Sequence, residues 1–146
     1  MSALQQSILS DRKQRAIEEK MRLKSMDPSR LWTDYMITNQ ASGKSYRIAL
    51  RGWQPGESYC SCPDFRKNTL GTCKHIIYAL KRGRAKFSKK VQNTPATVEE
   101  ICVYIKYGRR LELRLLLPEN LKREVLSQVS NEKVKSFAHE VKLPLF

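Results

Sequence analysis

The chain has 146 residues, 40% of them hydrophobic, with 28 basic and 14 acidic side chains and a formal net charge of +14. This length allows one ordinary domain or two very small ones. The chain lacks the ~18 consecutive apolar residues that span a membrane, and its N-terminus lacks the basic start and apolar run of a secretory signal. We therefore expect no membrane association and an intracellular, cytoplasmic protein, which would be nucleoid-associated in a prokaryote.

The positive charge is concentrated in the middle of the chain. Residues 1–30 have a net charge of +3 and residues 93–146 have +2, whereas residues 31–92 have +9 from 12 basic and 3 acidic side chains. A strongly cationic protein attracts polyanions. Nucleic acid is therefore the leading class of partner, ahead of an anionic membrane surface or an acidic protein.

Residues 1–30 form the first predicted segment, an N-terminal helix or leader. Ser10 or Asp11 can cap a helix that runs to about Lys24, and Pro28 lies beyond its end. The apolar stripe of this helix is thin, which predicts weak docking on the rest of the protein, with a partner-binding helix as the alternative. The stripe consists of Ala16, Ile17, Met21 and Leu23.

Residues 31–86 form the second predicted segment. Strands are expected at residues 35–38, at 46–51, where apolar and basic residues alternate, and at 57–62. A helix is expected from His75 to about Arg82, with Gly83 as its stop.

Two further segments complete the predicted organisation. Residues 87–98 have the composition of a basic linker. Within residues 99–146, the runs 101–107 and 111–117 predict a hairpin that turns at Gly108-Arg109-Arg110. Apolar spacing then predicts short helices near residues 121–129 and 134–141.

Three of the four cysteines and one of the two histidines fall within residues 60–75, in the pattern C-x-C, ten residues, C-x-H. In a reducing compartment, clustered cysteines more often bind metal than form disulfides. Side chains two apart on a strand share a face, and a loop entering a helix can bring the second pair from the opposite side. Four thiolate and imidazole ligands suit tetrahedral Zn²⁺ with no open position for a substrate. The predicted zinc ligands are Cys60, Cys62, Cys73 and His75.

This motif resembles the SWIM zinc finger, which has the same C-x-C, variable spacer, C-x-H signature. Phe65 matches the aromatic residue after the first pair, residues 76–80 match the apolar helix that begins at the histidine, and residues 45–51 match the preceding strand. The resemblance covers residues 32–82. It implies a small zinc-stabilised ββα-like finger. Together with the residue patterns outside it, this predicts an α+β fold with a flanking N-terminal helix and a C-terminal hairpin-plus-helix extension. The resemblance also implies binding of DNA or proteins.

A second stretch, within residues 103–121, is similar to the segment after the finger in bacterial Swi/Snf-type helicase-like ATPases. In that group an ATPase follows, whereas this chain stops at Phe146. A fragment, a split-gene subunit and a stand-alone relative are all open at this point.

Two apparent enzyme signatures fail on inspection, so we expect no catalytic residues and no small-molecule substrate. Gly43-Lys44-Ser45 lacks the earlier glycine of a phosphate-binding loop, because that position is Thr38, and it lies between two predicted strands. Cys102 lies in a predicted strand, where a buried structural cysteine is the usual finding, and His139 lies near the C-terminus among charged residues.

A dense basic run directly follows the predicted finger helix, with Phe87 inside it. A solvated helix end is the simpler explanation, but the position after the finger favours phosphate contact. Trp32 and Trp53 could stack on bases, although we expect at least one of them to cover the core. The predicted nucleic-acid-binding residues are Lys81, Arg82, Arg84, Lys86, Lys89 and Lys90.

The sequence therefore predicts a zinc-binding SWIM-type module that binds nucleic acid, with DNA favoured, as an accessory to a helicase-like or recombination system. The alternative is an adaptor that docks on a partner ATPase or recombinase. The salt dependence of binding distinguishes the two functions. Affinity through phosphate contacts falls steeply as salt rises, whereas affinity through an apolar docking surface falls much less.

Overall fold

The computed structural model describes residues 3–68, 70–97, 102–106, 112–116 and 118. The chain divides into two compact units, residues 1–95 and residues 96–146. The predicted zinc ligands and the predicted basic run lie in the first unit.

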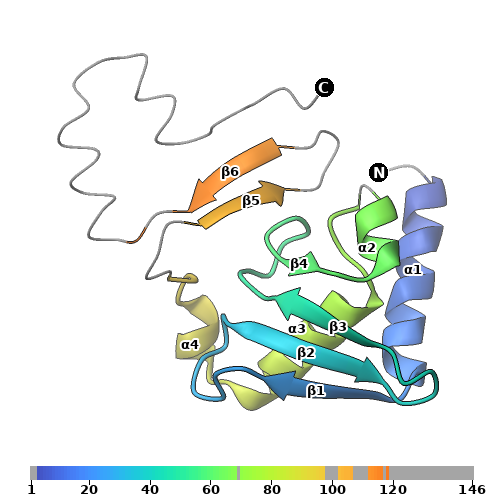
Figure 1. The fold of residues 1–146 in the computed structure, drawn as a ribbon, viewed down its shortest axis with the longest axis horizontal. Coiled ribbons are helices and arrows are strands. Elements are labelled where there is room, and N and C mark those ends of the chain that lie inside the picture. Colours follow the sequence, from blue (N-terminus) through green and yellow to red (C-terminus); the bar gives the residue numbers. More distant parts are fainter. Residues whose placement is uncertain (1–2, 69, 98–101, 107–111, 117, 119–146) are drawn as a thin grey trace. The chain divides into compact units, whose positions relative to one another are not determined.

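The first unit is α+β, as predicted, with an N-terminal helix, a four-stranded antiparallel sheet and then short helices (Figure 1). The strands are hydrogen-bonded in chain order, β1-β2-β3-β4. The elements are α1 (Ala3–Glu18), β1 (Met21–Ser25), β2 (Asp34–Asn39), β3 (Ser45–Ala49), β4 (Tyr59–Cys60), α2 (Pro63–Lys67), α3 (Lys74–Lys86) and α4 (Lys89–Asn93).

The core lies between one face of the sheet and α3, which runs behind the sheet in the view of Figure 1. Ile37 on β2 and Ile48 on β3 are fully buried, and α3 contributes Ile76 and Ala79. Because side chains alternate along a strand, this burial of every second residue leaves the opposite face of the sheet to solvent. The Tyr78 hydroxyl of α3 also donates to the Met21 carbonyl on β1 at 2.8 Å.

The N-terminal segment differs from the prediction. The helix begins at Ala3 rather than at Ser10 or Asp11 and ends at Glu18, and residues 21–25 form the edge strand β1 instead of its last turn. The sequence Met-Arg-Leu-Lys-Ser alternates apolar and polar residues, which also fits a strand. Pairing with β2, in which Met21 lies opposite Asn39 and is buried, decides the outcome.

The predicted stop at Gly83 is wrong, because α3 continues to Lys86. Gly83 is a buried residue inside the helix, and a Cβ atom there would lie 2.6 Å from Leu31 Cδ1. This glycine therefore permits close packing of the helix on Leu31 rather than ending the helix.

Residues 87–98 were predicted as a linker, but the segment contains the short helix α4 (Lys89–Asn93). Ser88 caps it, since the Ser88 side chain accepts a hydrogen bond from the Val91 amide. Two indole groups anchor its C-terminal end: Trp53 Nε1 donates to the Gln92 carbonyl at 2.9 Å and Trp32 Nε1 to the Thr94 carbonyl at 2.6 Å. Trp32 is buried, which confirms that at least one tryptophan covers the core.

In the second unit, β5 (Cys102–Lys106) and β6 (Glu112–Leu116) pair antiparallel, as the predicted hairpin requires. The predicted turn at residues 108–110 and the predicted helices near residues 121–129 and 134–141 lie outside the described residues.

Candidate metal centre

The structure brings the four predicted ligands together. Cys60, Cys62, Cys73 and His75 are all buried, and their ligand atoms lie within 4.8 Å of one another. The Nδ1 atom of His75 lies 3.8 Å from the sulfur of Cys60 and 4.0 Å from that of Cys73. The three thiols form no disulfide.

The two ligand pairs reach the cluster from opposite ends of the intervening loop. Of the strand predicted over residues 57–62, only residues 59–60 form a strand, β4. Cys62 is instead the N-cap residue of helix α2. Its backbone stays extended, with φ −68° and ψ 150°, so it still points to the same side as Cys60. Cys73 caps α3 and His75 lies in the first turn of that helix.

A glycine turn closes the loop between the two pairs. Gly71 has a φ of +66°, a conformation that side chains rarely adopt. Its carbonyl accepts a hydrogen bond of 2.8 Å from the Gly56 amide, which ties this loop to the one between β3 and β4. Phe65 is fully buried, as expected for the residue that fills the space beneath the cluster.

The ligand atoms, all within 4.8 Å of one another, are close enough to contract around a tetrahedral zinc ion. Zinc–sulfur bonds of about 2.3 Å and zinc–nitrogen bonds of about 2.0–2.1 Å place neighbouring ligand atoms roughly 3.6–3.8 Å apart. The observed sulfur–nitrogen distances of 3.8 and 4.0 Å need only a small contraction. The cluster is therefore consistent with a zinc site of the C-x-C…C-x-H pattern, in which four protein ligands would complete the coordination.

The three thiols strongly influence one another's ionisation. Hydrogen bonds from Cys60 and Cys73 hold the pKa of Cys62 well below its usual range. The hydrogen bond to Cys62 raises the pKa of Cys60 to about 12, and hydrogen bonds to Cys60 and Cys62 raise the pKa of Cys73. One thiolate is therefore favoured without a metal, and a bound dication would stabilise the other two.

Groups around the ligands hold them in place. The Phe65 amide donates to the sulfur of Cys62 at 3.3 Å, a contact that favours the thiolate. The ring of Tyr46 lies beside that of His75, with centroids 5.0 Å apart. Cys73 occupies the N-cap position of α3, where the helix dipole would favour its thiolate once a metal is bound.

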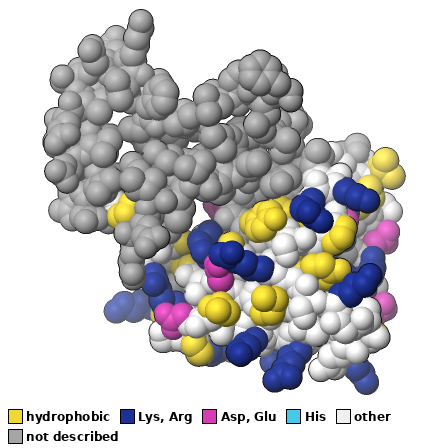
Figure 2. All heavy atoms as spheres, viewed as in Figure 1, with side chains coloured by type: hydrophobic (Ala, Val, Ile, Leu, Met, Phe, Trp, Pro, Cys, Tyr) yellow, Lys and Arg dark blue, Asp and Glu magenta, His cyan; other side chains and the backbone are white. Residues whose placement is uncertain are grey.

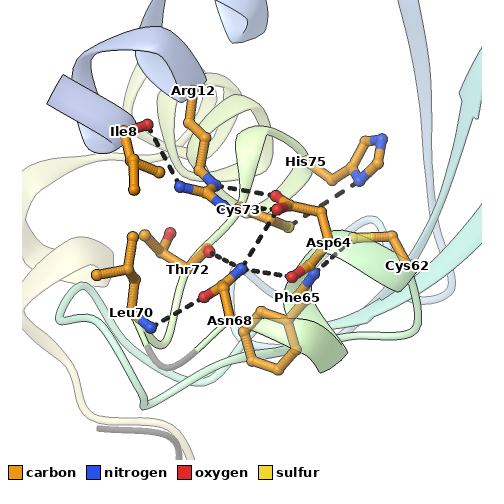
Figure 3. Close-up of polar contacts among 10 residues, drawn as sticks. All are labelled: Ile8, Arg12, Cys62, Asp64, Phe65, Asn68, Leu70, Thr72, Cys73 and His75. Carbon is orange, nitrogen blue, oxygen red and sulfur yellow. Dashed lines mark hydrogen bonds and ion pairs between the residues drawn. The ribbon is translucent and has the colours of Figure 1, made fainter. Parts of the chain in front are cut away.

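Helix α1 and the residue that follows it brace both ligand pairs, an arrangement that the sequence did not reveal. The Arg12 guanidinium makes a two-pronged contact with Asp64, at 2.9 and 2.6 Å, close to Cys62 (Figure 3). Two turns further along the chain, Glu19 pairs with Lys74, the residue between Cys73 and His75 in sequence. Residues seven apart share a face of a helix, so one side of this segment reaches both pairs.

The ionisation of these groups reflects the contacts. The hydrogen bond to Asp64 raises the pKa of Arg12. Burial opposes the ionised form of Glu19, but hydrogen bonds from Lys74 and Arg15 outweigh it and lower the pKa of that carboxyl. The contacts therefore favour the charged forms of Arg12 and Glu19.

Breaking the Arg12–Asp64 contact is expected to weaken the fold modestly. The Arg12 side chain is only 12% exposed but that of Asp64 is 45% exposed, so solvent screens the pair. A double-mutant cycle of Arg12→Gln and Asp64→Asn should give a coupling energy of about 1 kcal/mol in urea unfolding of the zinc-loaded protein. Gln14→Asn with Glu18→Gln, at an exposed α1 contact, is the control and should give much less. Additive single effects would contradict a bracing role.

Affinity for zinc is expected to rise with pH over the neutral range. In the metal-free fold Cys60 and Cys73 keep their protons because their pKa values are raised, whereas Cys62 has already lost its own. Binding must then expel two protons, so the apparent affinity should rise about 100-fold per pH unit. Competition with a coloured chelator between about pH 6.5 and 8 measures this slope. An affinity independent of pH would contradict the release of protons from Cys60 and Cys73 on binding.

A hollow of about 170 Å³ opens beside Cys62 and His75 and offers an entry path for an ion. Polar and basic side chains surround it. Its lining includes Arg12, Arg15, Asn39, Tyr46, Asp64 and Lys74.

The structure places the predicted basic residues at the other end of α3 and on α4, and all six side chains are exposed. Two of them make internal contacts: the Arg84 guanidinium lies 4.7 Å from the centre of the Trp53 ring, and Lys86 Nζ donates to the Pro28 carbonyl at 2.8 Å. Lys81, Arg82, Lys89 and Lys90 make no ion pair with any residue in the described ranges.

Of the remaining candidates, the described residues show only the Gly43 turn and the position of Cys102. Gly43, with a φ of +68°, lies in the turn between β2 and β3, and the residues after it form a strand rather than a helix that could bind phosphate. Cys102 starts β5, and His139 lies outside the described residues.

Comparisons with known proteins do not identify a family for this chain. A scan against protein-family profiles found no match, and searches of curated proteins and of solved structures found none either. Over the described residues, no helix is both long enough and apolar enough to cross a membrane.

Proposed function

We propose that this chain is a SWIM-type zinc module that binds nucleic acid, with DNA favoured. The observation that carries the proposal is the placement of α3, whose N-terminal end holds two of the four buried cluster residues and whose last turns carry exposed basic residues. A helix of 13 residues is about 20 Å long. A metal fixed at one end would therefore hold the basic end in a defined position.

The geometry favours binding over catalysis. Four protein ligands would fill a tetrahedral zinc ion, which leaves no position for a substrate or an activated water. The ββα-like finger of the SWIM type corresponds here to β3, β4 and α3, extended by β1 and β2. The free thiols fit a reducing, intracellular setting, and a helicase-like ATPase or a recombination protein is the proposed partner system.

Titration of a labelled DNA duplex into the zinc-loaded protein at several salt concentrations tests the proposal. Binding through phosphates must weaken steeply as salt rises. Absence of binding at about 50 mM salt would overturn it.

An adaptor that docks on a protein partner is the second candidate. Two large apolar side chains on α1 favour it, since Leu4 is 70% and Ile17 is 64% exposed. Capture of a partner ATPase or recombinase that persists at high salt, with no DNA binding, would favour this candidate instead.

A further inference from the structure

The sheet has a second face, opposite α3, that no helix of the first unit covers among the described residues (Figure 1). Strand register defines its side chains, because partners across a strand pair share a face. Thr38 and Ser45 show this directly, since their hydroxyl oxygens are 2.7 Å apart. The face consists of Arg22, Lys24, Asp34, Met36, Thr38, Ser45, Arg47, Ala49 and Tyr59, and Arg51, which follows β3, joins it through an ion pair with Asp34.

This outer sheet face is cationic. Arg22 and Lys24 on the edge strand β1 are exposed, and neither forms an ion pair within the described part of the chain. Arg47 and Arg51 share a single acid, Asp34, at 2.5 and 2.6 Å. Four cations against one carboxylate leave a net charge of +3. Figure 2 shows basic side chains spread over this face with hydrophobic ones between them.

The same face exposes two large apolar side chains. Met36 is 39% and Tyr59 is 38% exposed. They lie two strands apart, about 10 Å across the sheet, with β3 between them. The Tyr59 ring stands edge-on against the buried Phe65, with centroids 5.5 Å apart, so its orientation is fixed before any ligand arrives.

An exposed aromatic ring beside basic groups on an open sheet suits a single strand of nucleic acid. A free base can stack on an exposed ring while its phosphates meet lysine and arginine side chains. The bases of a duplex are already stacked, so they cannot use Tyr59. A protein partner would favour a face whose centre is depleted of charge, whereas here Met36 lies between Lys24 and Arg47.

We infer that the outer sheet face binds single-stranded nucleic acid. One base stacks on Tyr59, Met36 contacts the neighbouring base, and the phosphates lie along Arg22, Lys24 and Arg47. This inference rests on the proposed nucleic-acid function and assigns it a second surface, separate from the basic run on α3 and α4.

Fluorescence polarisation with a labelled oligo(dT) of about 15 nucleotides and with a duplex tests the inference. Tyr59→Leu should weaken binding of the single strand about 5- to 150-fold, the range for removal of one stacked base, and leave duplex binding within about twofold. Tyr59→Phe keeps the ring and should recover most of the affinity. Ile17→Ala, which removes another exposed apolar side chain, from α1, is the control. Zinc content and the melting temperature verify folding.

A second variant does not depend on the aromatic packing. Arg22→Gln with Lys24→Gln on the edge strand should flatten the salt slope for oligo(dT) by about 1.4, which is about 0.7 for each phosphate that is no longer neutralised. The inference would be overturned if the sheet variants lowered affinity equally for single strand and duplex. It would also be overturned if neither Tyr59→Leu nor the Arg22/Lys24 variant lowered affinity for the single strand. If only substitutions in the α3–α4 basic run lower binding, the proposed function stands without this surface. If the native protein binds neither DNA, the proposed function and this inference both fail.

Discussion

Replacing Cys73 by Ser is expected to abolish zinc binding and to destabilise the first unit severely. Cys73 is fully buried, directly precedes α3 and places its sulfur 4.0 Å from the Nδ1 atom of His75. A serine hydroxyl is a poor zinc ligand and remains protonated. Removal of one ligand from a closed site should cost about 3 kcal/mol or more, since binding energy at such a site is also folding energy.

For a unit of this size, such a cost corresponds to a fall in melting temperature of roughly 12–24 °C. Bound zinc is counted by native mass spectrometry, and unfolding is followed by far-UV circular dichroism with and without chelator. Cys102→Ser is the matched control, because Cys102 is the one cysteine that is not a predicted ligand, and it should leave metal content unchanged. Stoichiometric zinc in the Cys73→Ser protein, or none in the native protein, would refute the site.

The second large effect is expected from the basic run. Four of its side chains are exposed and make no internal ion pair in the described ranges, namely Lys81, Arg82, Lys89 and Lys90. If each neutralises one phosphate of duplex DNA, the logarithm of the affinity should fall with the logarithm of salt at a slope of roughly −3.6. This amounts to a weakening of about 100-fold between about 50 and 200 mM salt.

Changing these four residues to Gln should remove most of that slope and leave zinc content and melting unaltered. Arg84 and Lys86 are left in place, because their contacts with Trp53 and Pro28 would confound stability with binding. The charge-matched control changes four other exposed lysines, Lys13, Lys20, Lys44 and Lys67. Equal effects from the two sets would mean that the protein attracts DNA through net charge alone, with no defined site.

The metal centre was largely predictable from the sequence because its ligands are close in the chain. Cys60 and Cys62 are separated by one residue, as are Cys73 and His75, so each pair is placed by local backbone geometry. Only the meeting of the two pairs needed the fold, and Gly71 signalled the turn that joins them. The period-two pattern of residues 46–51 and the start of α3 at Lys74 were equally local.

What the sequence left undecided depends on partners distant in the chain. Met21–Ser25 fits a helix or a strand by its own pattern, and pairing with β2 made it a strand. Gly83 resembles a helix stop until Leu31 is found packed against it. The α1 brace on the metal centre joins Arg12 to Asp64, 52 residues apart, and no local signal predicts such a pair.

Local backbone geometry therefore placed the residues within each ligand pair. Tertiary packing determined which side chains surround the metal centre. A strand or helix period states which side chains share a face, but not what that face will meet. The outer sheet face depends on the same distinction, since Tyr59 becomes a neighbour of Arg47 and Met36 only when β4, β3 and β2 align. The physical reason is that burial free energy, which decides between local alternatives, belongs to contacts that only the folded chain creates.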